Sequence, residues 1–313
     1  MPDYYTFGNF KRAIQNPSLF LYESRRIAGS PFHSMYNQYI NKKSENGIDV
    51  MSEDWDNLII LDACRYDYFA SQNSLDGKLE EVTSRGKRSW EFMEGNFVGR
   101  EFHDTVYVTA NPHTSKLDDD LFHSVELLLN RWDDEIGTVQ PEEVVSAAVE
   151  AHESYPNKKL IIHFMQPHRP YIGPTAEKLR ERVDLVGFDN SSDGVQIWGA
   201  AKQGDITVSE VRKAYSESLE GVLDHVETLL DNINGKSVVT SDHGEMLGER
   251  IFPFANRLWG HSEGIATHTL LKVPWLIIDS DKRRETYQET PSTNMEFEED
   301  VIQDRLQALG YKT

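Results

Sequence analysis

The stretch KSVVTSDHGEMLGE at residues 236–249 decides the fold class that this sequence predicts. Its β-branched run at 237–240 is typical of a buried strand. Asp242 and His243 follow that run, and α/β proteins keep their chemistry where parallel strands end. The pair offers a carboxylate oxygen beside an imidazole nitrogen, and Gly244 allows a tight backbone turn. We therefore expect half of a metal site here.

A second acidic residue follows a second strand-like run. The segment NLIIL at 57–61 is the most strand-like run in the N-terminal third of the chain, and Asp62 comes directly after it. Parallel strands end along one edge of a sheet, so Asp62 and Asp242 can meet despite their separation in sequence.

Two histidines flank the end of a third predicted strand, KLIIHF at 159–164. His163 lies within this run, and His168 follows in the proline-rich segment MQPHRP at 165–170. The prolines make the exit from the strand rigid and extended. Both histidines are therefore candidates for the same edge of the sheet.

Three motifs in this order carry a resemblance to a known family. Asp62 after an apolar strand, HFMQPHRPY at 163–171 and TSDHGE at 240–245 resemble the motifs of the alkaline phosphatase and sulfatase superfamily, on its sulfatase-like branch. The resemblance covers about residues 55–280. It implies an α/β fold, a three-layer α/β/α sandwich with a mostly parallel central sheet (alkaline phosphatase-like). It also places the two histidines of the second motif where relatives bind the anionic group of the substrate.

The resemblance further implies a nucleophile that opens a helix after a glycine-containing turn, a few tens of residues beyond the first metal-binding acid. Ser89 fits this arrangement best, with Gly86 in the turn, and Ser84 and Thr83 are the alternatives. A hydroxyl at a helix N-terminus benefits from the backbone N–H groups when it carries an anionic group. Cys64 is a rival by residue type, but its position directly after a buried strand favours packing.

The segment after Ser89 departs from the pattern of true sulfatases. Their nucleophile lies in a Cys/Ser-x-Pro-x-Arg motif, and neither the proline nor the arginine follows Ser89 at the expected place. We therefore expect an unmodified serine, which favours phosphoryl chemistry over the cleavage of sulfate esters.

The predicted cofactor is one divalent metal ion, and His168 and His261 could supply ligands for a second. Two carboxylates and one imidazole do not distinguish Mn, Mg, Ca and Zn. The predicted metal ligands are Asp62, Ser89, Asp242 and His243. The predicted catalytic residues are Ser89 as the nucleophile, and His163, His168 or His261 as the group that protonates the leaving oxygen. The predicted substrate-binding residues are Arg65, Arg85 and Arg88.

These residues predict a metal-dependent hydrolase that cleaves a phosphate or sulfate ester through a covalent seryl intermediate. The substrate class is a small-molecule or glycan ester. Two alternatives stay open: a transferase that moves a phosphoryl-alcohol group onto a glycan, and a catalytically inactive sulfatase-like binding protein. The segment at 172–207 and the N-terminal segment are expected to carry the specificity.

Composition limits the partners and the compartment. The 313 residues include 52 Asp+Glu against 32 Lys+Arg, and the formal net charge of -20 repels nucleic acids and anionic lipids. The single cysteine excludes an intrachain disulfide and fits a reducing compartment. The sequence shows neither a signal-peptide pattern nor the roughly 20 apolar residues of a membrane span, so we expect a cytoplasmic protein. The oligomeric state stays unknown.

The predicted organisation is one sulfatase-like catalytic domain at residues 51–280. A helical N-terminal extension is expected at 1–50, and a tail with a helix, packed on the same domain, at 281–313. Residues 208–232 carry apolar side chains at helical spacing, which predicts an amphipathic helix against the sheet.

Overall fold

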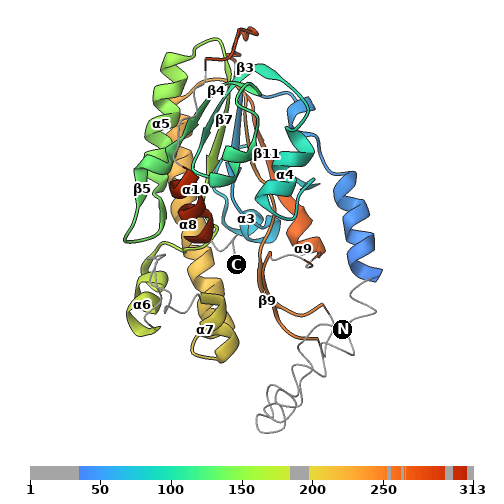
Figure 1. The fold of residues 1–313 in the computed structure, drawn as a ribbon, viewed down its shortest axis with the longest axis vertical. Helices are drawn as coiled ribbons and strands as arrows, with labels where there is room; N and C mark the ends of the chain where they lie inside the picture. Colours follow the sequence, from blue (N-terminus) through green and yellow to red (C-terminus); the bar gives the residue numbers. More distant parts are fainter. Residues whose placement is uncertain are drawn as a thin grey trace.

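The chain folds around a central β-sheet (Figure 1). The computed structural model describes residues 35–183, 197–251, 255–261, 264, 266–292 and 299–308, and within these the sheet has seven strands in the order β2-β11-β8-β1-β7-β3-β4. Strands β8, β1, β7, β3 and β4 run parallel to one another, whereas β11 is antiparallel to both β8 and β2. The predicted mostly parallel sheet is confirmed.

The elements have the following bounds. The strands of the central sheet are β1 (Asn57–Leu61), β2 (Lys78–Thr83), β3 (Phe102–Thr109), β4 (Phe122–Leu127), β7 (Lys159–Phe164), β8 (Ser237–Ser241) and β11 (Lys272–Ile278). The α-helices are α3 (Tyr66–Gln72), α4 (Ser89–Asn96), α5 (Pro141–Ser154), α6 (Pro174–Val183), α7 (Ile197–Gln203), α8 (Val208–Asn232), α9 (His268–Leu271) and α10 (Glu299–Ala308). Short 3-10 helices are η1 (Val50–Ser52), η2 (Pro112–Lys116) and η3 (Leu128–Arg131). Two small antiparallel pairs are β5 (Trp132–Asp133) with β6 (Thr138–Val139), and β9 (Met246–Glu249) with β10 (Leu258–Gly260).

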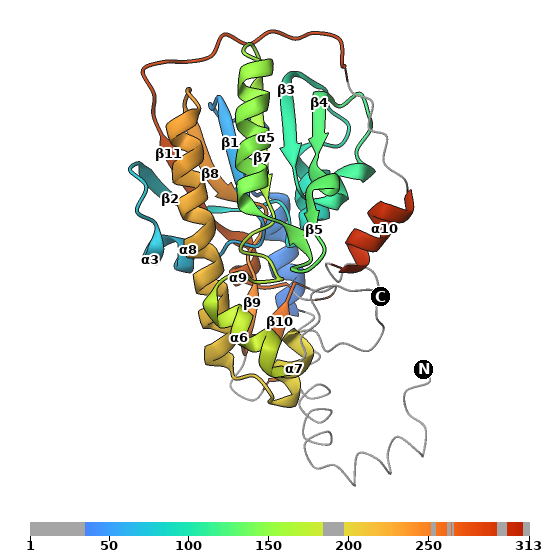
Figure 2. The same ribbon diagram turned by 90° about the vertical axis from the view of Figure 1, so that its left-hand side faces the viewer.

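Helices lie on both faces of the sheet. Helices α5 and α8 cover one face, and α4 and the helical residues 35–45 lie on the other (Figures 1 and 2). Helix α8 begins with a capping box between Thr207 and Glu210, and the predicted amphipathic helix at 208–232 is confirmed with the same bounds. The predicted three-layer α/β/α sandwich is therefore the fold of this chain.

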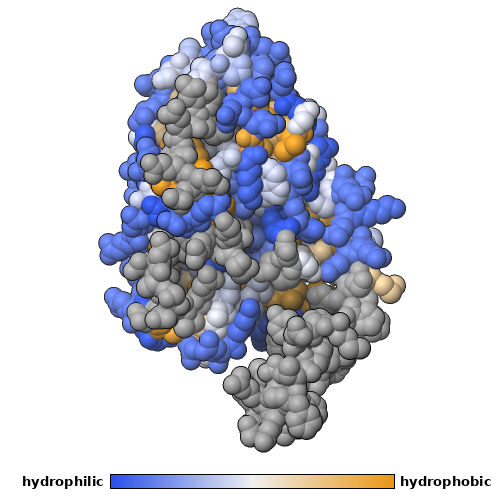
Figure 3. Space-filling view, viewed as in Figure 1, coloured by the Kyte–Doolittle hydropathy of each residue, from blue (hydrophilic) through white to orange (hydrophobic). Residues whose placement is uncertain are grey.

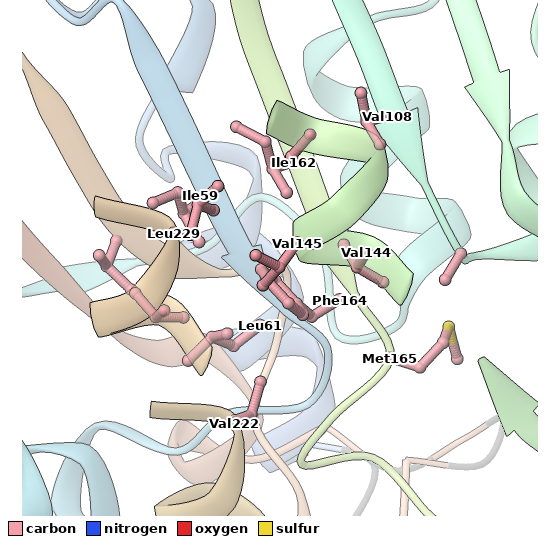
Figure 4. Close-up of a cluster of buried hydrophobic side chains, with 14 of the residues drawn as sticks. Ile59, Leu61, Val108, Val144, Val145, Ile162, Phe164, Met165, Val222 and Leu229 are labelled. Carbon is pink, nitrogen blue, oxygen red and sulfur yellow. The ribbon is translucent and has the colours of Figure 1, made fainter. Parts of the chain in front are cut away.

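The side chains of β1 alternate between the two layers of helices, because successive residues of a strand point to opposite faces. Ile59 and Leu61 belong to the cluster under α5 and α8 that Figure 4 shows. Leu58 and Ile60 pack instead with Phe92 of α4. All of these positions on β1 are fully buried, which explains why its sequence is a continuous apolar run.

A smaller apolar cluster lies beyond the ends of the parallel strands, where α6, α7 and the β9–β10 pair meet α8 (Figure 2). The rings of Trp198 in α7 and Trp259 in β10 lie 5.8 Å apart. The segment at 172–207, which was expected to carry specificity, contains α6 and α7. Residues 184–196 of this segment lie outside the described residues.

The C-terminal segment crosses the edge at which the parallel strands begin, and it leads to α10 (Figure 2). The backbone N–H of Tyr287 donates to the carbonyl of Asn157 at 3.2 Å and holds this segment against the domain. Of the predicted N-terminal extension, residues 1–34 lie outside the described residues, as do 293–298 and 309–313 of the predicted tail. The predicted domain bounds stay a prediction.

The face drawn in Figure 3 is mostly hydrophilic, with small hydrophobic areas. This surface agrees with the excess of acidic residues in the sequence. Within the described part of the chain, no helix has both the length and the apolar content that crossing a membrane requires.

Candidate metal centre and active site

The ends of β1 and β8 bring the first site residues together. The two strands are neighbours with Leu61 opposite Ser241, so Asp62 and Asp242 occupy adjacent positions at the edge of the sheet. His243 Nε2 lies 3.6 Å from Asp62 Oδ1 and 3.4 Å from Asp242 Oδ2. The convergence of two acids and one imidazole that the sequence predicted is therefore present in the structure.

Each of the two carboxylates has one oxygen held by the protein and one left open. Asp242 Oδ1 accepts the backbone N–H groups of Ala63 at 3.0 Å and His243 at 2.8 Å. Asp62 Oδ2 accepts the side-chain amide of Asn111 at 2.8 Å. Asp62 Oδ1 and Asp242 Oδ2 are buried and have no hydrogen-bond partner among the described residues. Because a buried carboxylate oxygen without a partner is costly, these two oxygens are suited to binding a cation.

The turn after β1 is held in a strained conformation. Ala63 has a φ of 60°, in the left-handed region that side chains with a Cβ atom rarely adopt. The Tyr215 hydroxyl donates to the Ala63 carbonyl at 2.8 Å and accepts the Arg65 N–H at 2.9 Å. The N–H of Cys64 donates to Ser241 Oγ at 2.8 Å. These bonds fix the position from which the Asp62 side chain extends.

Gly244 is required for a different reason from the one that the sequence suggested. It was expected to allow a tight turn, but its φ is not in the left-handed region. A Cβ atom at this position would overlap the carbonyl oxygen of Thr269, just before β11. The glycine therefore permits the close approach of two backbone segments behind His243.

Ser89 is the first residue of α4 and is fully buried. Its Oγ lies 3.3 Å from Asp62 Oδ2 and 3.4 Å from His243 Nε2. The alternative Ser84 has its hydroxyl engaged by the backbone, since it donates to the Asp242 carbonyl and accepts the N–H of Gly86 at 3.0 Å. The structure therefore brings Ser89, rather than Ser84, to the carboxylates.

The other nucleophile candidates lie elsewhere. Thr83 is the last residue of β2. Cys64 is fully buried in the apolar cluster under α8, and burial raises the pKa of its thiol well above the ordinary value. A thiol that stays protonated in apolar surroundings is a poor nucleophile, so its placement agrees with the expected packing role.

The electrostatics of the site favour the binding of a cation. Burial raises the pKa of Asp62, and the nearby charges of Asp242 and Glu245 raise it further. For Asp242, burial acts to raise the pKa, but His243 and His163 outweigh it and hold the pKa below its usual value. Burial lowers the pKa of His243 against the opposing charge of Asp242. Adjacent buried carboxylates repel one another, and a divalent cation between them removes that repulsion.

The donor set fits a divalent metal ion. Asp62, Asp242, His243 and Ser89 offer carboxylate oxygens, an imidazole nitrogen and a hydroxyl, which are ligands that such ions take in proteins. Asp62 and Asp242 also form a group with His163 in which one ligand atom from each lies within 4.8 Å of the others.

A second group of possible ligands consists of His168, Glu245 and His261, whose ligand atoms also lie within 4.8 Å of one another. Glu245 is fully buried, and its Oε1 lies 3.1 Å from His261 Nδ1. The rings of His261 and His243 are 4.4 Å apart, so this group adjoins the first. The predicted histidines 168 and 261 are thus brought together, with Glu245 as an unpredicted third member.

His163 lies deeper than a leaving-group acid requires. It is fully buried in β7, its Nδ1 contacts the hydroxyl of Tyr107 at 2.7 Å, and its Nε2 lies 3.9 Å from Asp242 Oδ2. Burial lowers its pKa to about 4 despite the opposing charge of Asp242. This environment does not favour the expected role as a proton donor to the substrate.

The structure does not bring Arg65 to the Ser89 hydroxyl. The Arg65 guanidinium forms ion pairs with Asp67 at 2.7 Å and Glu249 at 2.6 Å. Burial opposes its charge, but these acids raise its pKa above the ordinary value. Arg65 therefore ties the end of β1 to β9, and its expected role in substrate binding has no geometric support.

Arg85 and Arg88 differ in their relation to the site. Arg85 donates to the Gly95 carbonyl at 3.0 Å and pairs with Asp49 at 3.4 Å, so its charge is committed away from Ser89. Arg88 directly precedes Ser89 at the start of α4 and pairs with Glu91 at 2.7 Å. Of the three predicted arginines, Arg88 is the one that adjoins Ser89 in the sequence.

Sequence reasoning missed Asn111 and Glu245. Asn111 follows the end of β3, donates to Asp62 and accepts the N–H of His113 at 2.9 Å through its side-chain oxygen. Its signal was an amide residue between a strand end and a proline. The signal for Glu245 was its place directly after the Asp-His-Gly sequence.

The family model for Sulfatase matches residues 83–311. No curated protein matches the chain in sequence. Among solved structures, the chain is similar to the C-terminal periplasmic domain of EptC from Escherichia coli in complex with Zn, with 15% identity, a TM-score of 0.46, and coverage of 75% of this chain and 76% of that one.

Two further solved structures show similarities of the same order. One is the soluble domain of lipooligosaccharide phosphoethanolamine transferase A from Neisseria meningitidis, with 12% identity, a TM-score of 0.41, and coverage of 70% of this chain and 75% of that one. The other is the phosphonate monoester hydrolase SpPMH from Silicibacter pomeroyi, with 14% identity, a TM-score of 0.42, and coverage of 81% and 72%. The Sulfatase match itself spans more than half of the chain, and this protein therefore belongs to the sulfatase family.

Proposed function

We propose that this chain is a metal-dependent enzyme that cleaves a phosphate or sulfate ester, with Ser89 as the nucleophile. One observation carries the proposal: Ser89 Oγ lies 3.3 Å from Asp62 Oδ2 and 3.4 Å from His243 Nε2, beside carboxylate oxygens that are buried and open. A hydroxyl in this position at a helix N-terminus has what a nucleophile for an anionic ester needs.

Asp62, Asp242, His243 and Ser89 would hold the ion, which supplies charge neutralisation and a lowered pKa for the serine hydroxyl when it is bound. Mn, Mg, Ca and Zn all stay candidates. Asn111 holds Asp62 Oδ2, and the backbone holds Asp242 Oδ1, so both carboxylates keep their orientation as the ester binds.

The reaction has two steps, which are the attack of Ser89 on the ester and the release of the seryl intermediate by water. Ser89 Oγ forms a bond to phosphorus or sulfur while the bond to the ester oxygen breaks, and the Ser89 proton passes toward Asp62 Oδ2. We assign the proton for the leaving oxygen to His261, because Glu245 lies 3.1 Å from its other ring nitrogen and orients it. Water then attacks phosphorus or sulfur and His261 takes the proton of the water. The bond to Ser89 Oγ breaks, and Oγ takes back its proton from Asp62 Oδ2.

A second metal ion is an alternative within the same function. The group of His168, Glu245 and His261 would hold it. If it holds a second ion, His261 is a metal ligand and cannot be the proton donor. Metal content per chain, measured after reloading a chelator-stripped sample, decides between one ion with His261 as the acid and two ions.

The proposed activity is tested with a panel of p-nitrophenyl phosphate, bis-p-nitrophenyl phosphate and p-nitrophenyl sulfate, with each candidate metal. Ser89→Ala is expected to lower kcat on the best ester by on the order of 10³-fold or more. Ser71→Ala, which removes an exposed hydroxyl bonded to the Tyr68 carbonyl, is the matched control and should keep full activity. Failure of the metal-loaded protein to turn over any ester would favour the inactive binding protein.

Hydrolysis and transfer share the seryl intermediate and differ in what attacks it. The finer assignment therefore needs product analysis with an added acceptor alcohol or glycan. Free phosphate or sulfate as the sole product supports the hydrolase, and a modified acceptor that increases with acceptor concentration supports the transferase. Mass spectrometry of the trapped adduct should place the modification on Ser89 in either case.

A further inference from the structure

Tyr107 and His163 form a buried pair behind the metal centre. Both side chains are fully buried, and their rings are nearly parallel, with centroids 6.2 Å apart. The Tyr107 hydroxyl lies 2.7 Å from His163 Nδ1, a distance typical of a strong hydrogen bond from an O–H group. Tyr107 lies on β3 and His163 on the neighbouring strand β7. The pair therefore has a fixed geometry set by the sheet.

The surroundings of the Tyr107 oxygen indicate which partner carries the proton. The Tyr107 side chain is fully buried, and its hydroxyl bonds to His163 Nδ1. Nearby, Thr109 Oγ1 accepts the N–H of Asn111 at 3.0 Å and lies 3.3 Å from Thr114 Oγ1, so these two threonine hydroxyls are engaged with each other and with the backbone. Because a buried O–H group needs an acceptor, the Tyr107 hydroxyl donates to His163 Nδ1.

The proton on the other side of His163 follows from this arrangement. A neutral imidazole carries one N–H, so a ring whose Nδ1 accepts a hydrogen bond must be protonated on Nε2. His163 Nε2 faces Asp242 Oδ2 at 3.9 Å, and neither atom has a hydrogen-bond partner among the described residues. Asp242 Oδ1 is already occupied by two backbone donors, so Oδ2 is the oxygen that remains for the ion.

We propose that Tyr107 and His163 are positioning residues, and that His163 presents a protonated Nε2 toward Asp242 Oδ2 instead of binding the metal ion. The inference rests on the proposed metal site and adds to it, because Asp62, His163 and Asp242 lie close enough to share an ion. An Nε2 that carries a proton has no lone pair for a metal, which removes His163 from the ligand set. Metal-bound side chains are commonly oriented by such outer hydrogen bonds.

The first test measures the tautomer of His163 directly. Nitrogen NMR of the metal-free chain with isotope-labelled histidine, assigned with His163→Gln, should show Nδ1 without a proton and Nε2 with one. The reverse pattern would overturn the proposal. This measurement needs no turnover, so its failure is distinct from a failure of the proposed ester chemistry.

The second test uses the protein loaded with an NMR-active cadmium isotope. Coupling between cadmium and nitrogen is expected at His243, the proposed ligand, and should be absent at His163. Coupling at His163 would show that it binds the metal and would overturn its positioning role. Coupling at neither residue would overturn the proposed metal site and, with it, this role.

The third test removes only the hydroxyl. Tyr107→Phe keeps the ring that packs beside His163 and should weaken metal affinity by about 10-fold with unchanged stoichiometry. Tyr155→Phe is the matched control, since its hydroxyl bonds to Glu126 at 3.3 Å on the far side of the sheet, and its metal affinity should equal that of the wild type. Equal affinity in Tyr107→Phe and wild type, with the fold intact by circular dichroism, would contradict the proposal.

Discussion

Asp56 immediately precedes β1 and Asp62 immediately follows it, so this central strand has a buried aspartate at each of its two ends. Asp56 Oδ2 accepts the backbone N–H of Lys236 at 2.7 Å and forms an ion pair with Arg283 at 2.6 Å. Asp62 has acidic neighbours, and its Oδ1 has no partner among the described residues.

The two aspartates differ in their effect on stability. Asp56 stabilises the fold, whereas the rest of the fold has to offset the cost of holding Asp62 in place. A buried carboxylate paired with a cation adds to stability or is neutral, whereas one left beside other carboxylates is destabilising until a cation binds. The strained backbone of Ala63 and its hydrogen bond from Tyr215 hold Asp62 in this position. In the metal-free protein this position of Asp62 adds nothing to stability.

The largest expected effect comes from Asp62→Asn, which removes the charge that we assign to metal binding. Activity on the best ester should fall by on the order of 10³-fold, because the ion loses a ligand beside Ser89. The free energy of unfolding of the metal-free protein should stay equal or rise by about 1 kcal/mol, since a repulsive buried charge is gone. Steady-state kinetics and denaturant unfolding measure the two quantities.

Asp56→Asn is the matched control at the other end of β1. It should keep kcat/KM within a few-fold of wild type and lower the stability, because Arg283 loses its buried partner. If Asp62→Asn lost stability and kept activity, Asp62 would serve the fold as Asp56 does, and its assignment to metal binding would be wrong.

Arg283→Met is expected to have the next largest effect. It leaves Asp56 with the Lys236 N–H and no cation, and because the arginine is 44% exposed, solvent screening limits the loss of stability to about 1 kcal/mol. Arg182→Met serves as its control, since the exposed Arg182–Glu210 pair should contribute nothing measurable. Equal unfolding midpoints for Arg283→Met and wild type would show that Asp56 needs no cation.

The smallest expected effect comes from Ala63→Gly. Glycine adopts a φ of 60° without the cost that a Cβ atom brings, so the free energy of unfolding should rise by roughly 0.5 kcal/mol. Ala70→Gly in the exposed part of α3 is the control and should lower it by about 1 kcal/mol. Thermal or denaturant unfolding distinguishes the two signs, and a loss of stability in Ala63→Gly would mean that the turn stores no strain.

The strands that could be predicted from the sequence are those that have helices packed on both of their faces. Strands β1, β7 and β8 are fully or almost fully buried, so each has an apolar run within its sequence. Strand β2 at the edge of the sheet has the sequence KLEEVT with exposed and half-buried side chains, and this pattern resembles a charged loop. Its pairing depends on β11, which comes far later in the chain.

The site was predictable where chemistry followed a strand directly, as for Asp62, Asp242 and His243. Asn111, Glu245 and the partner of His163 could not be assigned, because their roles come from neighbouring strands that no local pattern specifies. For Arg65, the charge suggested an anionic substrate, but Glu249 lies across the fold and occupies it. The cytoplasmic location stays a prediction.

The place of β1 between β7 and β8 has a consequence for how the protein matures. During synthesis, Asp62 leaves the ribosome first, and Asp242 and His243 emerge only after the residues between them have been made. A nascent chain therefore cannot assemble this ligand set until His243 has left the ribosome, and the ion cannot be acquired there earlier.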